Sequence, residues 1–391
     1  MDTEKFACNK CGGKIRVDRE MCGDTIECPH CSNSIMVPLS GIKAGMAIGE
    51  YVPIKRLGVG AMGEVWLAKD SSRGRNIALK ILSPALTKNH MFVKRFQREV
   101  SIAAKMSHPN IVTAFDAGVD KNIYYLAINY VKGENLEKVL RRTGPLSEKD
   151  ALAIALAIAQ ALQYATEKHG LVHRDIKPGN IMIDDKGIPL LMDLGVSKQA
   201  GSQDAMLTTV GQFVGTPHYM SPEQARAEPD IDFSSDIYSL GCTLYHMLAG
   251  RPPFKAESNV EILNKHIHEN PRPAQYSNPE ISNSCAALLE IMLAKKKEDR
   301  QSSWTDVITD INAVIQGDFP ITPCKTNTRF YAMQNAVKSR PKNPADQILN
   351  QNGNSSAEEG DDFFEQRVGY FLAGVVFSII LLTCIWLLTR L

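Results

Sequence analysis

The eight residues HRDIKPGN, at positions 173 to 180, constrain the fold more than any other stretch of this chain. They bring an imidazole, a guanidinium, a carboxylate, an ammonium and an amide into one short segment. Pro178 and Gly179 disfavour a regular helix through it. Since desolvated polar groups are costly without partners, a loop with no task would not carry so many. The segment therefore predicts a rigid loop built for chemistry.

A glycine-rich motif lies more than a hundred residues earlier, in YVPIKRLGVGAMGEVWLAKD, where Gly58, Gly60 and Gly63 give GxGxxG. The spacing alone is weak evidence, because dinucleotide-binding folds use it as well. In those folds a helix follows the glycines, whereas EVWLA is rich in residues that favour strands. We therefore expect a glycine hairpin whose backbone amides can close over phosphate groups.

The next strand, NIALK, ends in Lys80, and a lysine among apolar neighbours needs a carboxylate partner. Glu99 is the candidate, because it lies in MFVKRFQREVSIAAKM, where Phe96, Val100 and Ala103 recur at helical spacing. The predicted ion pair between strand lysine and helix glutamate would orient the amine toward phosphate oxygens.

With the turn DLG at 193 to 195, the order and spacing of these motifs resemble the eukaryotic-like (bacterial-type) serine/threonine protein kinases over residues 51–317. Lys177, two positions after Asp175, resembles the serine/threonine branch of that family. GTPHYMSPE at 215 to 223 resembles the end of its activation segment, and the resemblance implies that Glu223 pairs with Arg300. It also implies an α+β fold of two lobes, a small β-rich N-lobe and a large α-helical C-lobe.

The resemblance assigns roles in phosphoryl transfer from ATP to Ser/Thr hydroxyls of protein substrates. Asp175 would accept the hydroxyl proton, and Lys177 would stabilise charge on the moving group. Asn180 and Asp193 would hold Mg²⁺ (or Mn²⁺), which prefers hard oxygen ligands. A pseudokinase scaffold that binds nucleotide or partners without transfer is the alternative.

The same resemblance predicts the nucleotide site. Lys80, held by Glu99, would grip the phosphates, Val65 and Ala78 would line the adenine slot, and Met182 would close its floor. Ile128 resembles the gatekeeper residue, and the hinge that reads adenine spans Asn129 to Val131. The glycine loop would contribute Leu57, Gly58, Val59, Gly60, Ala61, Met62, Gly63, Glu64 and Val65.

Regulation by phosphorylation is a further expectation. Arg174 can bind a phosphothreonine through two hydrogen bonds, and Thr208 and Thr209 are the candidate autophosphorylation sites. Plain polar loop residues are the alternative for both threonines. Self-association is one route to such autophosphorylation.

Residues 1–40 read as a separate zinc ribbon. Cys8 and Cys11 form one CxxC, Cys28 and Cys31 form another, and 16 residues separate the pairs, as in four-thiolate zinc sites. A unit of this size has too little core to fold unaided, so metal would supply folding energy. Iron or a redox pair is the alternative.

The C-terminal part has a different composition. Residues 318–366 are polar and predict a flexible juxtamembrane linker. Residues 368–389 carry no charge over 22 positions, about 33 Å as a helix, which matches a bilayer of about 30 Å. We expect a single-pass tail anchor there. Residues 151–165 are apolar but too short to span, and they predict a buried helix.

Charge and termini set the remaining expectations. The net charge of +1 argues against nucleic acid as a partner. The polar N-terminus MDTEKFACNK lacks the apolar run of an export signal, so a cytoplasmic kinase domain is expected, tethered to a membrane. No internal repeat is expected.

Overall fold

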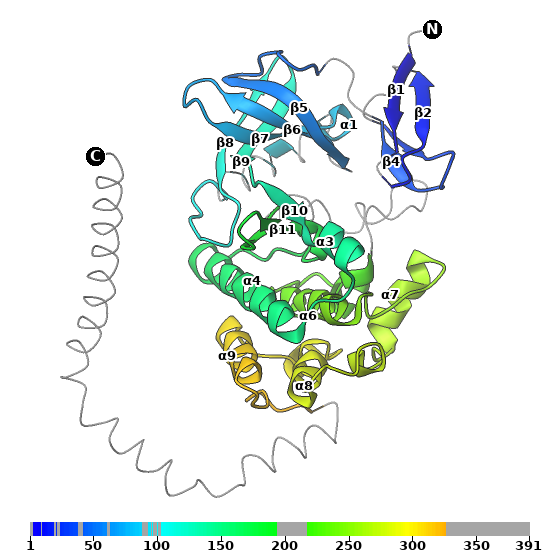
Figure 1. Ribbon diagram of the computed structural model, residues 1–391, viewed down its shortest axis with the longest axis vertical. Helices are drawn as coiled ribbons and strands as arrows, with labels where there is room; N and C mark the ends of the chain where they lie inside the picture. Colours follow the sequence, from blue (N-terminus) through cyan, green and yellow to red (C-terminus); the bar gives the residue numbers. More distant parts are fainter. Residues whose placement is uncertain are drawn as a thin grey trace, which may run out of the picture. The chain divides into compact units, whose positions relative to one another are not determined.

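The computed structural model describes residues 3–8, 10–18, 21, 24–37, 42–60, 63–87, 93–94, 96, 100, 103–193 and 217–325 (Figure 1). The predicted partner Glu99, the threonines Thr208 and Thr209, and the predicted membrane segment 368–389 lie outside these residues. Within the described ranges, no helix combines the length and apolar character needed to cross a membrane.

The first large element is a five-stranded antiparallel sheet in the order β5-β6-β7-β9-β8, seen in blue to cyan in Figure 1. The glycine motif joins two of its strands, with Gly58 opposite Val65 and Gly60 opposite Gly63. The predicted hairpin is therefore confirmed, and the helix of a dinucleotide-binding fold is excluded. The strands are β5 (Tyr51–Gly60), β6 (Gly63–Asp70), β7 (Asn76–Leu82), β8 (Ala114–Asp120) and β9 (Ile123–Asn129).

The strand register decides which side chains share a face of this sheet. Val65 lies opposite Lys80, and Ala78 lies opposite Ile128. Because opposed residues point to the same side and alternate residues share a face, these four side chains line one face. The other face buries an apolar cluster made of Ile48, Tyr51, Trp66, Ala68, Ile77, Leu79, Ile81, Tyr125 and Ala127.

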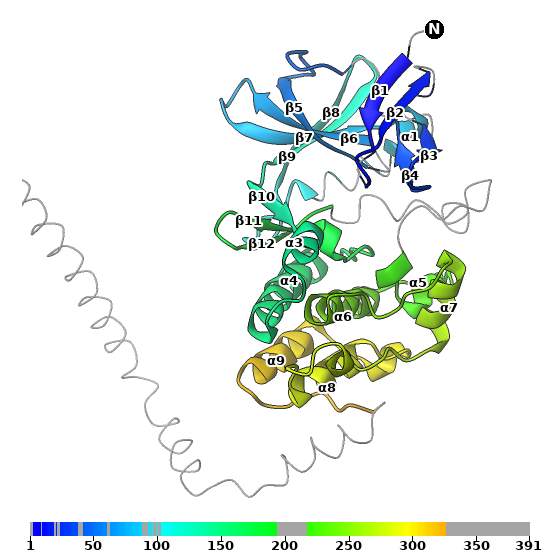
Figure 2. The ribbon, with the colours of Figure 1, turned by 45° about the vertical axis from the view of Figure 1, so that its right-hand side comes forward.

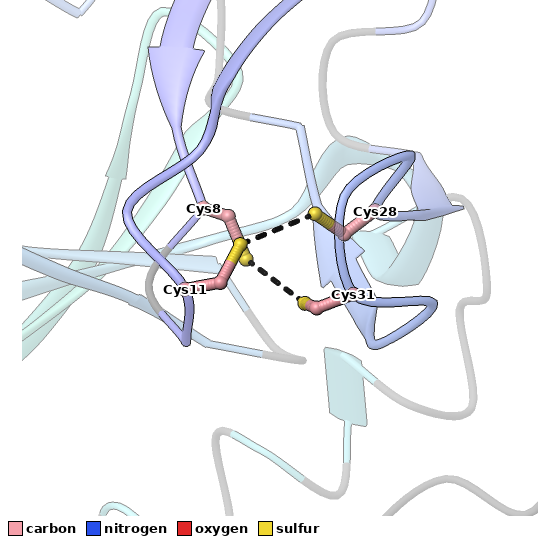
Figure 3. Close-up of side chains that lie close together, drawn as sticks. All are labelled: Cys8, Cys11, Cys28 and Cys31. Atoms are coloured by element: carbon pink, nitrogen blue, oxygen red, sulfur yellow. Dashed lines mark hydrogen bonds between the residues drawn. The ribbon is translucent and has the colours of Figure 1, made fainter.

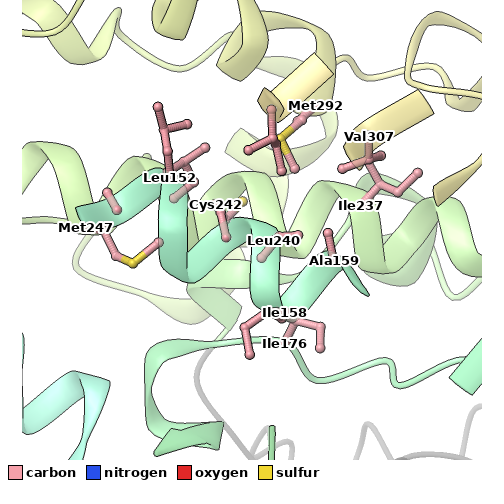
Figure 4. Close-up of a cluster of buried hydrophobic side chains, with 14 of the residues drawn as sticks. Leu152, Ile158, Ala159, Ile176, Ile237, Leu240, Cys242, Met247, Met292 and Val307 are labelled. Atoms are coloured by element: carbon pink, nitrogen blue, oxygen red, sulfur yellow. The ribbon is translucent and has the colours of Figure 1, made fainter. Parts of the chain in front are cut away.

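The second large element is a group of helices around one apolar core. Figure 4 shows part of this core, a single buried cluster that includes Leu152 and Ile158 of α4, Leu240 of α6, Met292 of α8 and Val307 of α9. The helices are α3 (Leu136–Thr143), α4 (Glu148–His169), α5 (Pro222–Ala225), α6 (Phe233–Ala249), α7 (Asn259–His268), α8 (Asn283–Met292) and α9 (Trp304–Ile315), and α1 (Pro84–Thr87) follows the sheet strand β7.

Helix α4 contains the apolar stretch 151–165, so the prediction of a buried helix there is confirmed. The Ser147 side chain accepts the amide of Asp150 at its start, and Gly170 ends it in a left-handed conformation. Its buried positions, among them Ala155, Ile158 and Leu162, contain many alanines, which let α6 and α9 approach closely.

Residues 318–325, which we call the C-terminal strap, pack onto the helices. Cys324 is fully buried beside Ala287 and Ile291. Asp310 of α9 is also buried, and its Oδ1 accepts the amides of Ile321 at 2.7 Å and Thr322 at 3.1 Å. The expected flexible linker was drawn from residue 318, whereas the folded region continues through residue 325.

The N-terminal residues form two small antiparallel hairpins, labelled in Figure 2. Each has the same turn: Gly12 N donates to Cys8 O at 2.9 Å, and Ser32 N donates to Cys28 O at 2.8 Å. Gly12 and Ser32 also share a positive φ. The expectation of no internal repeat is therefore wrong at this scale. The strands are β1 (Thr3–Ala7), β2 (Lys14–Asp18), β3 (Thr25–Glu27) and β4 (Ser34–Met36).

Candidate active site

The loop 173–180 is held in place through its backbone. The buried carboxylate of Asp236, in the first turn of α6, accepts the amides of His173 and Arg174, each at 2.7 Å. Burial raises the pKa of Asp236, while His173 and the two amides oppose that shift. Arg174 has a φ of 64°, uncommon for a residue with a side chain, and the two hydrogen bonds maintain it. The contact of Asp236 with this loop could not be predicted from the sequence, because 62 residues separate Asp236 from Arg174.

The His173 ring joins this loop to the segment that carries Asp193. Its Nδ1 accepts the amide of Asp175 at 3.3 Å, so the neutral ring carries its proton on Nε2 and donates it to Met192 O at 2.9 Å. The three-stranded sheet β10-β11-β12 flanks both segments, and Met192 N donates to Asn180 O at 2.9 Å. Its strands are β10 (Gly133–Asn135), β11 (Ile181–Asp184) and β12 (Pro189–Leu191).

Asp175, Lys177 and Asn180 form one polar group. Lys177 Nζ lies 2.8 Å from Asp175 Oδ2, and Asn180 Nδ2 donates to the same oxygen at 2.9 Å and to Asp175 O at 2.8 Å. Both amide protons of Asn180 are used in this way, so its Oδ1 remains the atom suited to a cation. The structure thus brings together these three residues, which the sequence singled out.

Asp193 meets Lys80 of the sheet, with 2.7 Å between Oδ1 and Nζ. Desolvation raises the pKa of Asp193, but the charge and hydrogen bond of Lys80 outweigh it and hold that pKa below its usual value. Asp193 also has a positive φ of 53°. Asp193 is therefore the carboxylate partner that a lysine among apolar neighbours needs. The predicted partner Glu99 lies outside the described residues.

The glycine hairpin approaches its neighbour strand closely at one position. A Cβ on Gly63, which has a φ of 143°, would lie 1.8 Å from the carbonyl oxygen of Ile81. Gly58 has no such restriction, since nothing lies within 4 Å of the corresponding position. Leu57 is exposed, Val59 is half-buried, and the side-chain positions of Gly60, Ala61 and Met62 are outside the described set.

Glu64 lies on the other face of the hairpin. Its buried carboxylate accepts Trp66 Nε1 at 2.7 Å and Arg56 Nη1 at 3.3 Å. Alternation along β6 places it away from Val65 and Lys80. Glu64 can therefore serve a nucleotide on the Val65 face through its backbone, while its side chain stabilises the sheet.

The remaining predicted nucleotide contacts lie on β7, β9 and β11. Ala78 is buried, and Val65 and Met182 are half-buried. The amide of Asn129 already donates to Thr113 O at 2.9 Å. The hinge from Asn129 to Val131 would therefore offer other backbone groups to a base.

Glu223 and Arg300 form a buried two-bond ion pair, which confirms the predicted pairing. The two N···O distances are 2.7 and 2.9 Å, and Ser235 Oγ donates to Glu223 Oε1 at 2.6 Å. Burial raises the pKa of Glu223, but Arg300 and Ser235 overcome that effect and lower it to about 2. The pair links α5 to the loop before α9, behind the catalytic loop.

The sheet and the helical domain have the arrangement of the protein kinase class. The two carboxylates lie with a loop lysine, a loop amide and a strand lysine, as the site of that class requires. The family model described as "Protein kinase domain" matches residues 51–312. The chain belongs to the protein kinase family, and the relatives it matches are named serine/threonine-protein kinases.

Two curated relatives are bacterial. A probable serine/threonine-protein kinase PknB of Bifidobacterium longum is 34% identical over 320 residues, covering 78% of this chain and 46% of that protein. The PknB of Mycolicibacterium smegmatis is 35% identical over 271 residues, covering 68% and 43%. The chain thus spans less than half the length of these relatives.

A solved structure supports the same fold. The PknI kinase domain of Mycobacterium tuberculosis has a TM-score of 0.56 and 30% sequence identity to this chain. The match covers 70% of this chain and 99% of that domain. The predicted two-lobed kinase fold is therefore confirmed.

Proposed function

We propose that this chain is an active serine/threonine protein kinase that transfers the γ-phosphate of ATP to hydroxyl groups of proteins. The observation that supports this most strongly is the joint placement of Asp175, Lys177, Asn180, Asp193 and Lys80 with complementary charges. A pseudokinase scaffold would have no need to keep all of these groups.

Each of these residues has a step for which its position fits. Asp175 would accept the proton of the substrate hydroxyl while Lys177, already at 2.8 Å, balances negative charge beside it. Lys80 would exchange its contact with Asp193 for phosphate oxygens, as a strand lysine facing the Val65 side of the sheet can. Asn180 Oδ1 and the Asp193 carboxylate fit Mg²⁺, which would neutralise phosphate charge when bound.

The proposal is tested by measuring phosphate transfer from Mg-ATP to a serine/threonine protein substrate. Asp193→Asn removes a metal-binding charge and should reduce transfer by about a hundredfold or more. Asp185→Asn, which alters an exposed carboxylate paired with Lys132, should leave transfer unchanged. Equal activity of wild type and Asp193→Asn would assign the signal to a contaminant, and an inactive wild type that still binds ATP would favour the scaffold.

Regulation and membrane attachment also belong to the proposal. We propose that Thr208 or Thr209 is autophosphorylated and that Arg174 receives the phosphate, because Arg174 Nε is buried without a partner among the described residues. Residues 368–389 would anchor the chain in a membrane, with the kinase domain cytoplasmic. Phosphopeptide mapping tests the first point. For the second, the full chain should stay in the membrane fraction after alkaline extraction, whereas a chain ending at residue 366 should be released.

We propose in addition that Cys8, Cys11, Cys28 and Cys31 bind one structural Zn²⁺. Their sulfur atoms all lie within 4.8 Å of one another (Figure 3). Cys8 and Cys31 are 3.9 Å apart at sulfur, and Cys11 and Cys28 are 3.7 Å apart. Zinc–sulfur bonds of about 2.3 Å give a tetrahedron with edges of about 3.8 Å, close to these two distances.

The surroundings of the thiols also favour a metal. Lys10 N donates to Cys8 Sγ and His30 N to Cys28 Sγ, each at 3.4 Å. Backbone amides of Cys11 and Lys10 lower the pKa of Cys8 to about 6, which favours its thiolate. The Gly13 amide lowers the pKa of Cys11, but burial and the neighbouring thiols outweigh it and raise that pKa to about 12, so the negative charge is concentrated on Cys8. Among the described residues of this small cluster, the buried side chains other than cysteine are Ile15 and Ile35. So small a core needs a metal to fold.

Metal analysis of the full chain tests the zinc site. We expect about one zinc per chain, lost in Cys28→Ser, with phosphate transfer retained because the thiols are separate from Asp175. Cys242→Ser, at a buried cysteine of α6, is the control that should keep the zinc. Iron in place of zinc, or no metal, would reject the assignment.

A further inference from the structure

The short 3-10 turn Pro217–Tyr219 adjoins the catalytic loop. Gln224, which caps the helix just after this turn, donates through Nε2 to Arg174 O at 3.0 Å. Tyr219 lies within electrostatic reach of Glu137. The Glu137 carboxylate is in turn 3.5 Å from the Cβ position of Gly179, in the loop that carries Asp175. A protein that presents a hydroxyl to Asp175 must therefore pass close to this turn.

One anchor of the turn is His246 of α6. Its Nδ1 is 2.6 Å from the Tyr219 hydroxyl, and the two rings are stacked with an interplanar angle of 15°. Burial lowers the pKa of His246 to about 4, although the charge of Glu137 opposes this. Burial also raises the pKa of Tyr219. The ring is thus neutral and the phenol protonated, so the tyrosine donates and the histidine accepts.

A second anchor starts at Lys295, whose ammonium can only donate. Lys295 Nζ donates to the Tyr238 hydroxyl at 3.2 Å and to His266 O at 2.9 Å. Since Tyr238 accepts there, its own proton goes to His266 Nδ1 at 2.9 Å. The His266 ring then carries its proton on Nε2. The chemistry of three side chains thus fixes one direction for the whole chain of hydrogen bonds.

This chain of hydrogen bonds ends at Nε2 of His266. His266 is fully buried, and its Nε2 has no hydrogen-bond partner of full geometry among the described residues. Burial lowers the pKa of His266 and Lys295 lowers it further, while the backbone of His218 acts in the opposite direction. Helix α7, which carries His266, packs on the turn.

We propose that His246 and His266 are positioning residues that hold the 217–219 turn in the shape that binds the protein substrate. Neither touches ATP or the reacting atoms. His246 of α6 accepts the Tyr219 hydroxyl of the turn, and the buried His266 lies on α7, which packs against the turn. The inference rests on the kinase activity proposed above and adds which residues set substrate affinity.

The test compares His266→Leu, which loses the hydrogen bond from Tyr238, with His266→Gln, which keeps an acceptor for it. His246→Leu and His246→Gln form a second pair. We expect each leucine variant to raise KM for a serine/threonine peptide about tenfold, the value of one hydrogen bond, with KM for ATP unchanged. Each glutamine variant should restore KM to within about twofold of wild type. His268→Leu, at an exposed histidine on the same helix, is the matched control.

A second measurement does not depend on activity. Hydrogen–deuterium exchange of the amides of residues 218–221 should be faster in His266→Leu than in wild type and His268→Leu, with the α4 amides unchanged. Unchanged exchange together with unchanged peptide KM would overturn the proposal. Equal rises in both KM values would overturn it too, because they indicate general loss of structure. If the wild type transfers no phosphate, the proposed function fails, while the exchange experiment still decides the role of His266.

Discussion

At the scale of single residues, the buried charges described here are held by partners of opposite charge or by several hydrogen bonds. Asp193 faces Lys80, Glu223 faces Arg300, and Asp236 accepts two backbone amides. Such pairs are costly to break from one side, because the remaining group stays buried and uncompensated. The strongest effects of substitution are therefore expected at these residues.

Glu223→Gln should lower the free energy of unfolding by about 3 kcal/mol, since it leaves the Arg300 guanidinium buried without its counter-charge. Urea denaturation at neutral pH measures the change. Glu228→Gln is the matched control, because the Glu228–Arg226 pair is exposed and should contribute less than about 1 kcal/mol. Similar losses in both variants would contradict the role given to the buried pair.

The lowered pKa of Glu223 makes the free energy of unfolding depend on pH. Its folded-state pKa of about 2 is below the unfolded value of about 4.3, so the unfolded chain binds the proton more readily. The stabilisation is therefore complete above about pH 5 and is lost as the pH falls toward 2. The difference in unfolding free energy between wild type and Glu223→Gln should shrink over that window. A difference that stays constant down to about pH 2.5 would show that the carboxylate charge is not responsible.

At the scale of elements, the side chains of the glycine hairpin alternate between the two faces of the sheet. Val65 and Lys80 face one side, and Glu64 faces the other, where Trp66 and Arg56 hold it. The motif could be recognised from its glycines and the strand-forming residues after them. Which face of the sheet each side chain occupies could not be predicted from the sequence, because it depends on the register with β7.

Gly63→Ala should destabilise the sheet by about 2 kcal/mol or more, because the added methyl group would collide with the Ile81 carbonyl at a φ of 143°. Gly58→Ala is the control within the same hairpin, since its position is open. Thermal unfolding with no ligand measures both. Equal melting temperatures for the two variants would contradict the close approach of β6 and β7.

At the scale of the whole molecule, the motifs in the sequence predict most of the active-site residues, but not the distant residues that hold them in place. Asp175, Lys177 and Asn180 lie within one octapeptide, so their proximity follows from local chain geometry. The Asp236 and histidine contacts join segments dozens of residues apart, and no local pattern announces them. Composition also misplaced the end of the folded region. The strap is held by backbone bonds to Asp310 and by the burial of Cys324, and neither contact can be read from composition.

The strap gives a prediction about truncation. The free energy of unfolding of a chain ending at residue 317 should be about 2–4 kcal/mol lower than that of a chain ending at residue 325. The shorter chain exposes apolar surface and leaves Asp310 without the strap amides. Ile321→Ala in the longer chain, at a side chain that is 58% exposed, should have little effect. Equal stability of the two truncations would show that the strap does not contribute to the fold.

The role of Asp175 as proton acceptor can be measured as the rate of phosphate transfer to a serine/threonine peptide by Asp175→Asn, compared with wild type and Asp185→Asn. Asp175→Asn keeps the size and most hydrogen bonds of the side chain but cannot accept the hydroxyl proton. We predict a loss of about a hundredfold to ten-thousandfold in kcat with ATP binding retained, and no loss in Asp185→Asn. Wild-type transfer rates in Asp175→Asn would contradict the account of this site.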